Sequence, residues 1–323
     1  MTEPPRLTVY WYSQTGQLKE TVDAFVEPLA EAGWRIEWCE VTPAVDYPFP
    51  WPLRRFLGIM PAATDPAETV EVTLDGAGSG AGDGTGDAPD LVLLAYQVWY
   101  LAPSVPMRSV LARHPDRFAR RGVIGLTACR NMWYSAALAV ARSVSSAGGR
   151  YLGTVAAVDD APAGATFVTT MRWMLTGRRE AFSVFPRAGV GDGQLARVRA
   201  LGAAVADEVG RARADEHADS VARVLARPDA APVEPAIAAA DLLAGRVFRA
   251  WSGLARAGRP GLLRGAVLAA FATWLTGAVA VGLPAVVVTR TMARRRFDAL
   301  VHRAMRPASP GAPPGRVGEM VAG

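Results

Sequence analysis

The sequence predicts a doubly wound α/β domain, because strand-like and helix-like segments alternate along its first two thirds. Five short runs have the composition of strands, and three of them, 90–95, 122–127 and 151–158, are apolar enough to be buried on both faces, as in a parallel sheet. Segments with helical periodicity separate most of them. The strand-like runs cover residues 7–11, 34–41, 90–95, 122–127 and 151–158. We expect them to form one five-stranded parallel sheet in the order 2-1-3-4-5.

The helices are predicted from the spacing of apolar residues and from the glycines that follow them. A helix is expected from Leu18 to about Ala32, others over 105–113 and 135–147, and a closing helix over 194–208. Together with the strands they define a domain over residues 1–210. Two insertions interrupt it, one over 43–89 that is rich in proline and glycine, and one over 161–193. The glycine-rich part, 75–87, is expected to be a flexible loop.

Composition restricts the class of protein. Half of the 323 residues are hydrophobic, which is enough for a large core. Cys39 falls on the second predicted strand and Cys129 just after the fourth, which lie well apart in the sheet, so no disulfide is expected and a reducing compartment fits. Three histidines and two cysteines are scattered too widely to predict a metal site. The first residues lack a signal-peptide pattern, so we expect the domain in the cytoplasm.

Positive charge is concentrated near the end of the sequence. Between residues 246 and 306 there are eleven Arg against one acid, Asp298, which gives +10, so the rest of the chain carries about −5 of the net +5. A nucleic-acid-binding domain usually carries its charge on the folded domain, with exposed aromatics. Here the arginines flank apolar segments. The distribution therefore predicts an anionic membrane surface as partner and not a nucleic acid.

The turn after the first strand has the residues of a phosphate-binding loop. Ser13-Gln14-Thr15-Gly16-Gln17 leads into the first helix, so backbone N–H groups and the helix dipole converge there. Ser13 and Thr15 supply hydroxyl donors, and Gly16 allows close approach of the ligand. The motifs typical of nucleoside triphosphate and dinucleotide sites are missing. One monophosphate is the expected ligand, and an ordinary polar strand–turn–helix is the alternative.

These residues resemble the phosphate loop of flavodoxins, in which Leu18 would replace a usual Thr or Asn. The segments 96–104, 129–133 and 172–178 extend the resemblance over residues 6–193. As a set they resemble bacterial flavodoxin-like proteins labelled dialkylresorcinol condensing enzyme. The resemblance implies bound FMN, held by the turn and by two later loops. In those loops the implied cofactor-binding residues are Gln97, Trp99, Tyr100, Cys129, Arg130, Asn131 and Trp133.

The label names a condensation, which needs an activated cysteine with a histidine partner. None of His114, His217 and His302 lies in a candidate loop, and Cys129 has no evident base. The resemblance therefore implies a flavin-dependent oxidation of a dialkyl-cyclohexanedione to a dialkylresorcinol, with a separate ketosynthase partner for the condensation. No catalytic residue is predicted. The alternative is an electron carrier, or a binding module without a substrate of its own.

The loops after the third and fourth parallel strands are expected to border the flavin ring. Trp99, Tyr100 and Trp133 are candidates to stack on it, and Arg130 to place positive charge beside it. For the two tryptophans the alternative is a place in the core, and for Arg130 a surface charge. The insertion 161–193 is either an additional helix packed on the sheet or part of a pocket for an alkyl-chain or aromatic-precursor substrate.

The remaining sequence predicts attachment to the cytoplasmic face of the cell membrane. Residues 211–240 are expected to be a solvated helical connector, and 307–323 a disordered tail. Residues 264–290 form a hydrophobic segment without charge from 265 to 289, either one span or a hairpin bent near Pro284. Residues 241–260 predict a basic amphipathic helix, or a helix packed on the domain. Its apolar face has Leu243, Val247, Trp251 and Leu254, and the opposite side has Arg246, Arg249 and Arg256.

Overall fold

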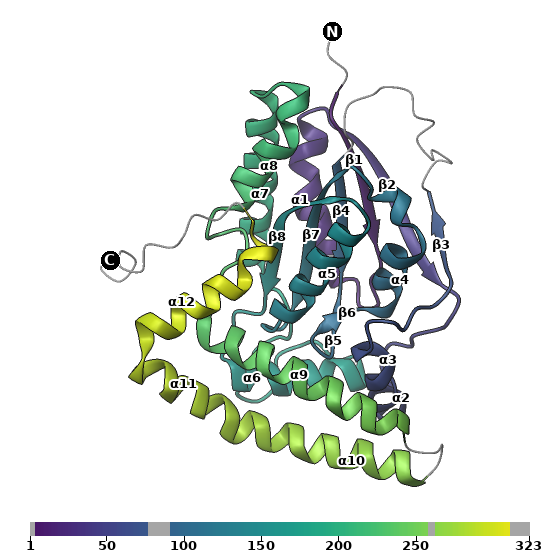
Figure 1. Cartoon of the computed structure of the whole chain (residues 1–323), viewed down its shortest axis with the longest axis vertical. Helices are drawn as coiled ribbons and strands as arrows, with labels where there is room; N and C mark the ends of the chain where they lie inside the picture. Colours follow the sequence, from purple (N-terminus) through teal and green to yellow (C-terminus); the bar gives the residue numbers. More distant parts are fainter. Residues whose placement is uncertain (1–3, 77–90, 258–261, 311–323) are drawn as a thin grey trace.

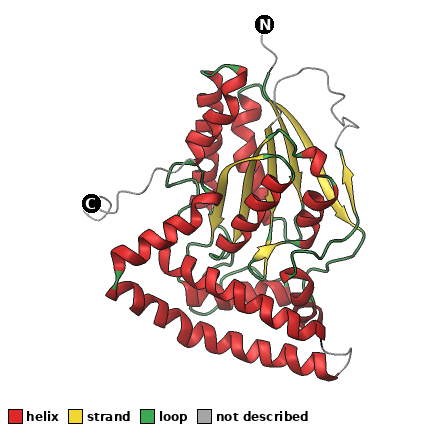
Figure 2. Cartoon of the chain, in the orientation of Figure 1, coloured by secondary structure: helices red, strands yellow, loops and turns green. Residues whose placement is uncertain are grey.

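A six-stranded, mostly parallel sheet forms the centre of the molecule (Figures 1 and 2). The computed structural model describes residues 4–76, 91–257 and 262–310. The strands run in the order β3-β2-β1-β4-β7-β8. Their bounds are β1 Arg6–Trp11, β2 Arg35–Pro43, β3 Val72–Asp75, β4 Leu91–Tyr96, β7 Gly122–Cys129 and β8 Arg150–Val158.

The five parallel strands have the predicted order 2-1-3-4-5, which the structure confirms. The additional strand β3 pairs antiparallel with β2 at the edge of the sheet. It comes from the insertion 43–89, and its four residues are too short to give a clear alternation in the sequence. The glycine-rich segment predicted over 75–87 lies, from residue 77 on, outside the described residues.

Helices cover both faces of the sheet and divide the core into two main parts. Leu7 and Val9 of β1 point to one face, where α1, α7 and α8 lie, and Tyr10 points to the other, where α4 and α5 lie. This alternation is what a strand buried on both sides requires. The helices are α1 Gln17–Glu31, α4 Val105–Arg113, α5 Tyr134–Ser146, α7 Asp192–Gly210 and α8 His217–Leu225.

Shorter elements cover the edge at which the parallel strands end. The insertion 43–89 contributes α2 Leu53–Gly58 and α3 Met60–Thr64. The residues after β4 form a small hairpin of β5 Val98–Trp99 and β6 Ala102–Pro103. The insertion 161–193 contains α6 Ala163–Thr176.

The segment expected to be a solvated connector takes part in the core. Val221 and Leu225 of α8 are buried in the same hydrophobic cluster as α1 and α7. After α8 the chain runs along β8, where the Ala156 N–H donates to the carbonyl of Ala230 at 3.1 Å. Alanine and arginine dominate this stretch, and such a composition does not reveal which few positions are buried. The connector expected over 211–240 is therefore packed on the domain and not solvated.

Four helices follow and return to the same domain (Figure 1). Their bounds are α9 Pro235–Ala257, α10 Leu262–Gly277, α11 Leu283–Met292 and α12 Arg294–Met305. A π-helical turn, Ala278–Gly282, joins α10 to α11, so the apolar segment is one continuous helix and the hairpin alternative is wrong. Pro284 accounts for the turn, because a proline removes a backbone donor and disturbs the preceding helical turn.

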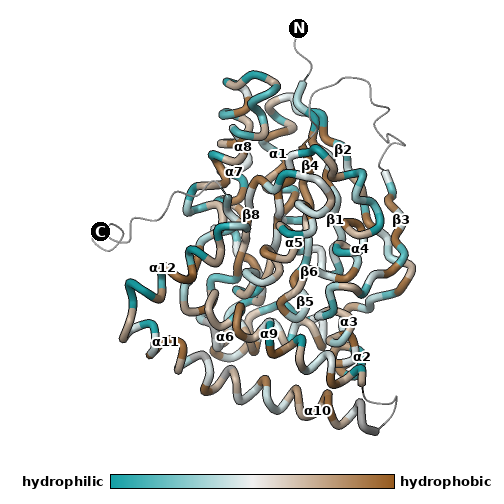
Figure 3. Tube along the Cα trace, in the orientation of Figure 1, coloured by the Kyte–Doolittle hydropathy of each residue, from teal (hydrophilic) through white to brown (hydrophobic). Residues whose placement is uncertain are grey.

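Residues 265–292 are long and apolar enough to cross a membrane, judged by length and composition alone, and 12% of their most apolar 18-residue window is buried. Figure 3 shows hydrophobic residues recurring along α10 and α11, whereas hydrophilic residues dominate α12. Of the predicted tail 307–323, residues 311–323 lie outside the described residues. Ala308 ends a short 3-10 turn and is buried, so the start of that tail is ordered.

Helix α9 contacts the domain through a face that the sequence pattern did not reveal. Its buried residues include Asp241, Gly245, Phe248 and Ser252. The predicted apolar face lies away from the domain, with Leu243 and Leu254 exposed. Small and polar residues mark the packed face, and hydrophobic periodicity does not detect such a face.

Helices α1 and α7 approach each other very closely at Gly202. A Cβ atom at this position would lie 2.1 Å from the carbonyl oxygen of Phe25. We expect Gly202→Ala to lower the free energy of unfolding by about 1–3 kcal/mol, because one of the two helices must move. Urea denaturation measures the change.

Gly210 in the same helix is the matched control, since a Cβ atom there meets nothing within 4 Å. We expect Gly210→Ala to leave the stability unchanged or to raise it slightly. Equal effects of the two substitutions would contradict the close helix contact.

Candidate functional site

The turn between β1 and α1 leaves several hydrogen-bond donors free around one glycine. Gly16 adopts a left-handed conformation with φ 79°, and a Cβ atom there would meet nothing within 4 Å. The first hydrogen bond of the helix runs from the N–H of Glu20 to the carbonyl of Gly16 at 3.0 Å. The N–H groups of Gln17 and the next two residues therefore have no partner within the helix. The Ser13 Oγ atom is buried and has no hydrogen-bond partner.

The side chain of Arg179, which follows α6 in the sequence, lies beside the first turn of α1. In the orientation of the Gln17 amide that suits both its oxygen and its nitrogen, the oxygen accepts from the N–H of Val190 at 2.6 Å and from the Arg179 guanidinium at 2.7 Å. Arg179 also lies 3.5 Å from a carboxylate oxygen of Glu20, and it donates to the carbonyl of Ala188 at 3.1 Å. The segment 177–191 is thus held against the turn, and it brings a positive charge to the positive end of the helix.

Asp159, just after β8, holds the same segment from the other side. Its carboxylate accepts from the N–H groups of Ala161 at 3.0 Å and Gly189 at 2.9 Å. Burial raises the pKa of Asp159 above its ordinary value. Gly189 has φ 92°, and a Cβ atom there would lie 2.3 Å from the Gln17 amide. Only glycine fits this contact.

An aromatic cluster lies beside the turn. Tyr47 and Trp51 come from the proline-rich insertion, Tyr12 directly follows β1, and Trp99 comes from the hairpin after β4. The centre of the Trp99 ring lies 4.9 Å from that of Tyr47, 5.8 Å from Trp51 and 6.2 Å from Tyr12. The Gln14 side chain donates to the Tyr47 carbonyl at 2.9 Å, which ties the cluster to the turn.

The loop after β4 is a tight hairpin whose tip contacts the C-terminal helices. Trp99 donates through its indole N–H to Gln97 Oε1 at 3.2 Å and is only 8% exposed. Tyr100 has φ 49°, an uncommon backbone conformation for a bulky residue. Its ring centre lies 6.3 Å from Phe248 of α9 and 6.1 Å from Phe271 of α10.

The loop after β7 contributes some predicted residues and leaves others out. The Arg130 guanidinium lies 5.5 Å from the ring centre of Phe167 in α6, and burial lowers its pKa. The Asn131 Oδ1 atom is buried without a partner. Burial raises the pKa of Cys129 to about 12, so this thiol is not an activated nucleophile. Trp133 is fully buried and stacks on Tyr134 at 4.4 Å, which places it in the core.

Buried side-chain atoms without partners concentrate at this edge of the sheet. Buried polar groups are nearly always hydrogen-bonded, so such a concentration indicates a polar ligand or ordered water. In the part of the chain that the structure describes, these atoms include Ser13 Oγ, Gln14 Oε1, Trp51 Nε1, Ser104 Oγ and Asn131 Oδ1.

The structure brings most of the predicted residues to one edge. Trp99 contacts Tyr12, so the loops after β1 and β4 meet. The Asp159 N–H donates to the carbonyl of Arg130 at 3.0 Å, and Asp159 reaches the first turn through Gly189. Trp133 is separate from this group. The described residues contain no cluster of three or more His, Cys, Asp or Glu that is suited to a metal ion.

Sequence reasoning missed Asp159, Tyr47 and Trp51 as neighbours of the turn. Arg179 belongs to the insertion 161–193, for which the sequence suggested an additional helix or part of a substrate pocket and no contact with the turn. Asp159 carries a detectable signal, because an acid directly follows the last parallel strand. Arg179 carries none, since it follows α6 in a stretch without periodicity.

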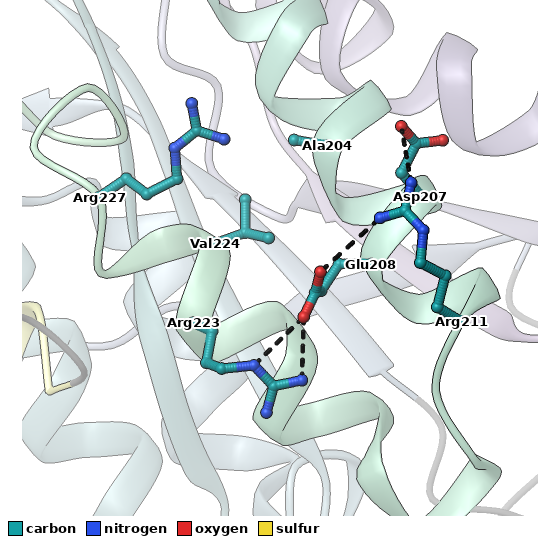
Figure 4. Close-up of a pocket in the computed structure, with 7 residues that line it drawn as sticks. All are labelled: Ala204, Asp207, Glu208, Arg211, Arg223, Val224 and Arg227. Carbon is teal, nitrogen blue, oxygen red and sulfur yellow. Dashed lines mark hydrogen bonds and ion pairs between the residues drawn. The ribbon is translucent and has the colours of Figure 1, made fainter.

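A separate cavity of about 290 Å³ lies between α7 and α8 (Figure 4). Ion pairs of Glu208 with Arg223 and Arg211 line it, and these side chains are largely exposed. None of the predicted site residues belongs to it. We therefore treat it as a solvated surface feature.

Asp241 of α9 joins the C-terminal helices to the loop after β7. Its carboxylate accepts from the N–H groups of Tyr134 and Ser135 at 3.1 and 3.0 Å. These are the first two residues of α5, so Asp241 satisfies donors that a helix N-terminus leaves free. The carboxyl is buried in the process.

No protein-family model and no curated protein matches the chain. Among solved structures, it is similar to a flavoprotein in complex with FMN from Lactobacillus acidophilus NCFM. The two are 16% identical, the match covers 48% of this chain and 93% of the other, and the TM-score is 0.32.

The pH dependence of stability tests the burial of Asp241. Burial raises its pKa from 3.8 to about 6, so the folded protein binds this proton more tightly than the unfolded chain. The resulting contribution to stability is present below the unfolded pKa and is lost as the pH rises through about 6. Relative to Asp241→Asn, we expect the wild type to lose about 3 kcal/mol of unfolding free energy from about pH 3 to 7.

Urea denaturation of both proteins across this range measures the difference. A difference that stays constant with pH would contradict a buried, titrating carboxyl at this contact.

Proposed function

We propose that this chain is a flavodoxin-like FMN oxidoreductase that oxidises a dialkyl-cyclohexanedione-type ring to a dialkylresorcinol. The main support for bound FMN is the buried, unpartnered Ser13 hydroxyl beside the free N–H groups at the start of α1. The substrate is inferred from the resemblance of the turn and the later segments to the dialkylresorcinol proteins.

The residues at the turn fit a phosphate monoester. Ser13 and Thr15 would donate hydroxyl hydrogen bonds, and the N–H groups around Gly16 and Gln17 would surround the phosphate oxygens. Gly16 leaves open space where a side chain would obstruct the ligand. Arg179, which is paired with Glu20 at 3.5 Å, places its guanidinium beside the same helix end.

The flavin ring would pack on the aromatic cluster. Trp99 and Tyr12 offer ring faces next to the turn, and Gln97 and Asn131 offer polar groups from the two neighbouring loops. Because Trp99 is almost buried, a ring bound here replaces contacts that Trp99 makes with Tyr47 or Trp51. Arg130 would place positive charge near the ring and stabilise its reduced form.

Bound FMN would supply the acceptor for the two electrons that leave the ring when it becomes aromatic; two protons leave with them. The preceding condensation is assigned to a ketosynthase partner, because the Cys129 thiol is not activated.

The covering of the site favours an enzyme over an electron carrier. A carrier must leave the flavin edge accessible to its protein partners. Here the proline-rich insertion, α6 and the segment 177–191 lie over the edge of the sheet, and α9 and α10 contact Tyr100. The apolar residues of this cover suit an alkyl-chain substrate. We propose that the enzyme works at the cytoplasmic face of the membrane, where such a substrate partitions.

Phosphate recognition is tested with two ligands that differ only in the phosphate. We expect Ser13→Ala and Thr15→Ala each to weaken FMN binding by about tenfold to a hundredfold, because a hydrogen bond to a charged group is lost. Riboflavin lacks the phosphate, so its weaker binding should not change. Fluorescence titration measures both affinities.

Gly210→Ala, far from the turn, is the control. Unchanged FMN affinity in both hydroxyl variants would remove the turn from the cofactor site, and an equal loss for riboflavin would indicate a general structural defect.

The reaction is tested with the FMN-loaded protein under anaerobic conditions. We expect a 2,5-dialkylcyclohexane-1,3-dione to bleach the oxidised flavin, because its aromatisation delivers two electrons. The corresponding resorcinol, already aromatic, should leave the spectrum unchanged.

Dithionite serves as a control that shows the flavin to be reducible. Reduction by dithionite but not by the dione would contradict the oxidation and favour the electron carrier.

A further inference from the structure

The long apolar helix is fixed at both ends to the same domain. Before it, α9 docks through Asp241 on α5 and through Ser252, whose hydroxyl donates to the carbonyl of Pro61 at 2.9 Å. After it, Val301 and Met305 of α12 are buried in the cluster that contains Trp133. A membrane crossing would place one end on the far side of the bilayer and would require one of these attachments to break.

Two further contacts secure the second end. Arg290, in the last turn of α11, pairs with Asp298 of α12 at 2.8 Å, which fixes the bend between the two helices. Beyond α12, the hydroxyl of Thr154 in β8 donates to the carbonyl of Ala308 at 2.8 Å. The C-terminal end of the apolar helix is therefore attached, through α12, to the core of the sheet.

The large aromatic side chains of the helix point toward the protein. Phe271 packs edge to face on Phe248 of α9 at 5.1 Å, and Trp274 lies 6.3 Å from Trp251. The opposite face carries no charge between residues 265 and 289. Exposed apolar residues on it include Val281 at 71%, Val287 at 44%, Val288 at 56% and Met292 at 84%, and the adjoining α9 exposes Leu243 at 55% and Leu254 at 53%.

Arginines border this apolar surface. Arg295 and Arg296 are exposed just after the helix, and Arg246 and Arg249 are exposed on α9. An apolar surface of this extent bordered by cations is typical of a helix that lies at an anionic membrane interface. The helix has 28 residues, about 42 Å at 1.5 Å per residue, whereas the hydrocarbon layer is about 30 Å thick.

We propose that α9 and the helix of residues 265–292 lie flat on an anionic bilayer, with both ends of the long helix on the side of the domain. The inference rests on the membrane attachment proposed above and adds the orientation of the two helices relative to the bilayer. Tyr100, at the tip of the loop after β4, contacts Phe248 and Phe271 on the buried side of these helices, so the two helices lie between the candidate site and the proposed lipid surface.

Vesicle flotation of the full-length protein tests the surface. We expect the protein to float with vesicles of phosphatidylcholine and phosphatidylglycerol and to stay behind with phosphatidylcholine alone. The double variant Val281→Asp, Val288→Asp should lose binding at least tenfold. Val184→Asp is the matched control, because Val184 is 88% exposed elsewhere and its change should have no effect.

Thiol labelling separates a flat helix from a spanning one. Gly265→Cys and Thr291→Cys place a reactive group near each end of the long helix, at exposed positions. In sealed inverted membrane vesicles from cells that express the protein, a membrane-impermeant maleimide should label both variants without detergent. Wild-type protein measures the background from Cys39 and Cys129.

Three results would overturn the proposal. Labelling of only one end until detergent is added would show a spanning helix. Equal flotation with neutral vesicles would remove the role of the arginines. A lipid-free dimer that the Val281 and Val288 double variant converts to a monomer would show that a second copy covers this face. None of these measurements uses the flavin, so they stand apart from the test of the proposed chemistry.

Discussion

At the edge where its parallel strands end, this chain buries polar atoms that no other protein atom satisfies. The cause is the topology: β1 sends the chain to one face of the sheet and β4 sends it to the other, so the loops diverge between them. A buried hydroxyl without a partner costs about 1–3 kcal/mol. The unpartnered side-chain atoms of Ser13 and Asn131 are shielded from water because other segments of the chain cover them. A polar molecule bound beneath these segments would supply the missing hydrogen bonds and remove that cost.

The covering segments are held by a few polar contacts between distant parts of the sequence. Asp159 binds the backbone of Gly189, and Gly189 in turn packs on Gln17 at the start of α1. Asp241 does the same for the C-terminal helices at the start of α5. In both cases a buried carboxylate receives N–H groups and orders a segment over the edge of the sheet. The position of the cover is thus coupled to the helix ends that border the candidate site.

Sequence reasoning predicted the parts of the fold that follow from periodicity. The apolar runs of the parallel strands and the spacing of Leu18, Val22 and Phe25 gave the correct sheet and its first helix. The strand β3 is too short to show a pattern, and α9 packs through small and polar residues such as Gly245 and Ser252. In the candidate site, the turn after β1 was visible as a motif. Arg179 was not associated with it, because three-dimensional neighbours separated by more than a hundred residues leave no local signal.

Helix α12 packs back on the domain and therefore belongs to the same folding unit as the sheet. Trp133 and Tyr134 share one buried hydrophobic cluster with Val301 and Met305, which follow them by more than 160 residues in the sequence. During synthesis the sheet and its first helices leave the ribosome well before α12, so this cluster cannot be complete until α12 has been made. The apolar helix that precedes α12 has been made by that time as well. Completion of this part of the core and presentation of the exposed apolar surface are therefore one late event in the synthesis of these residues.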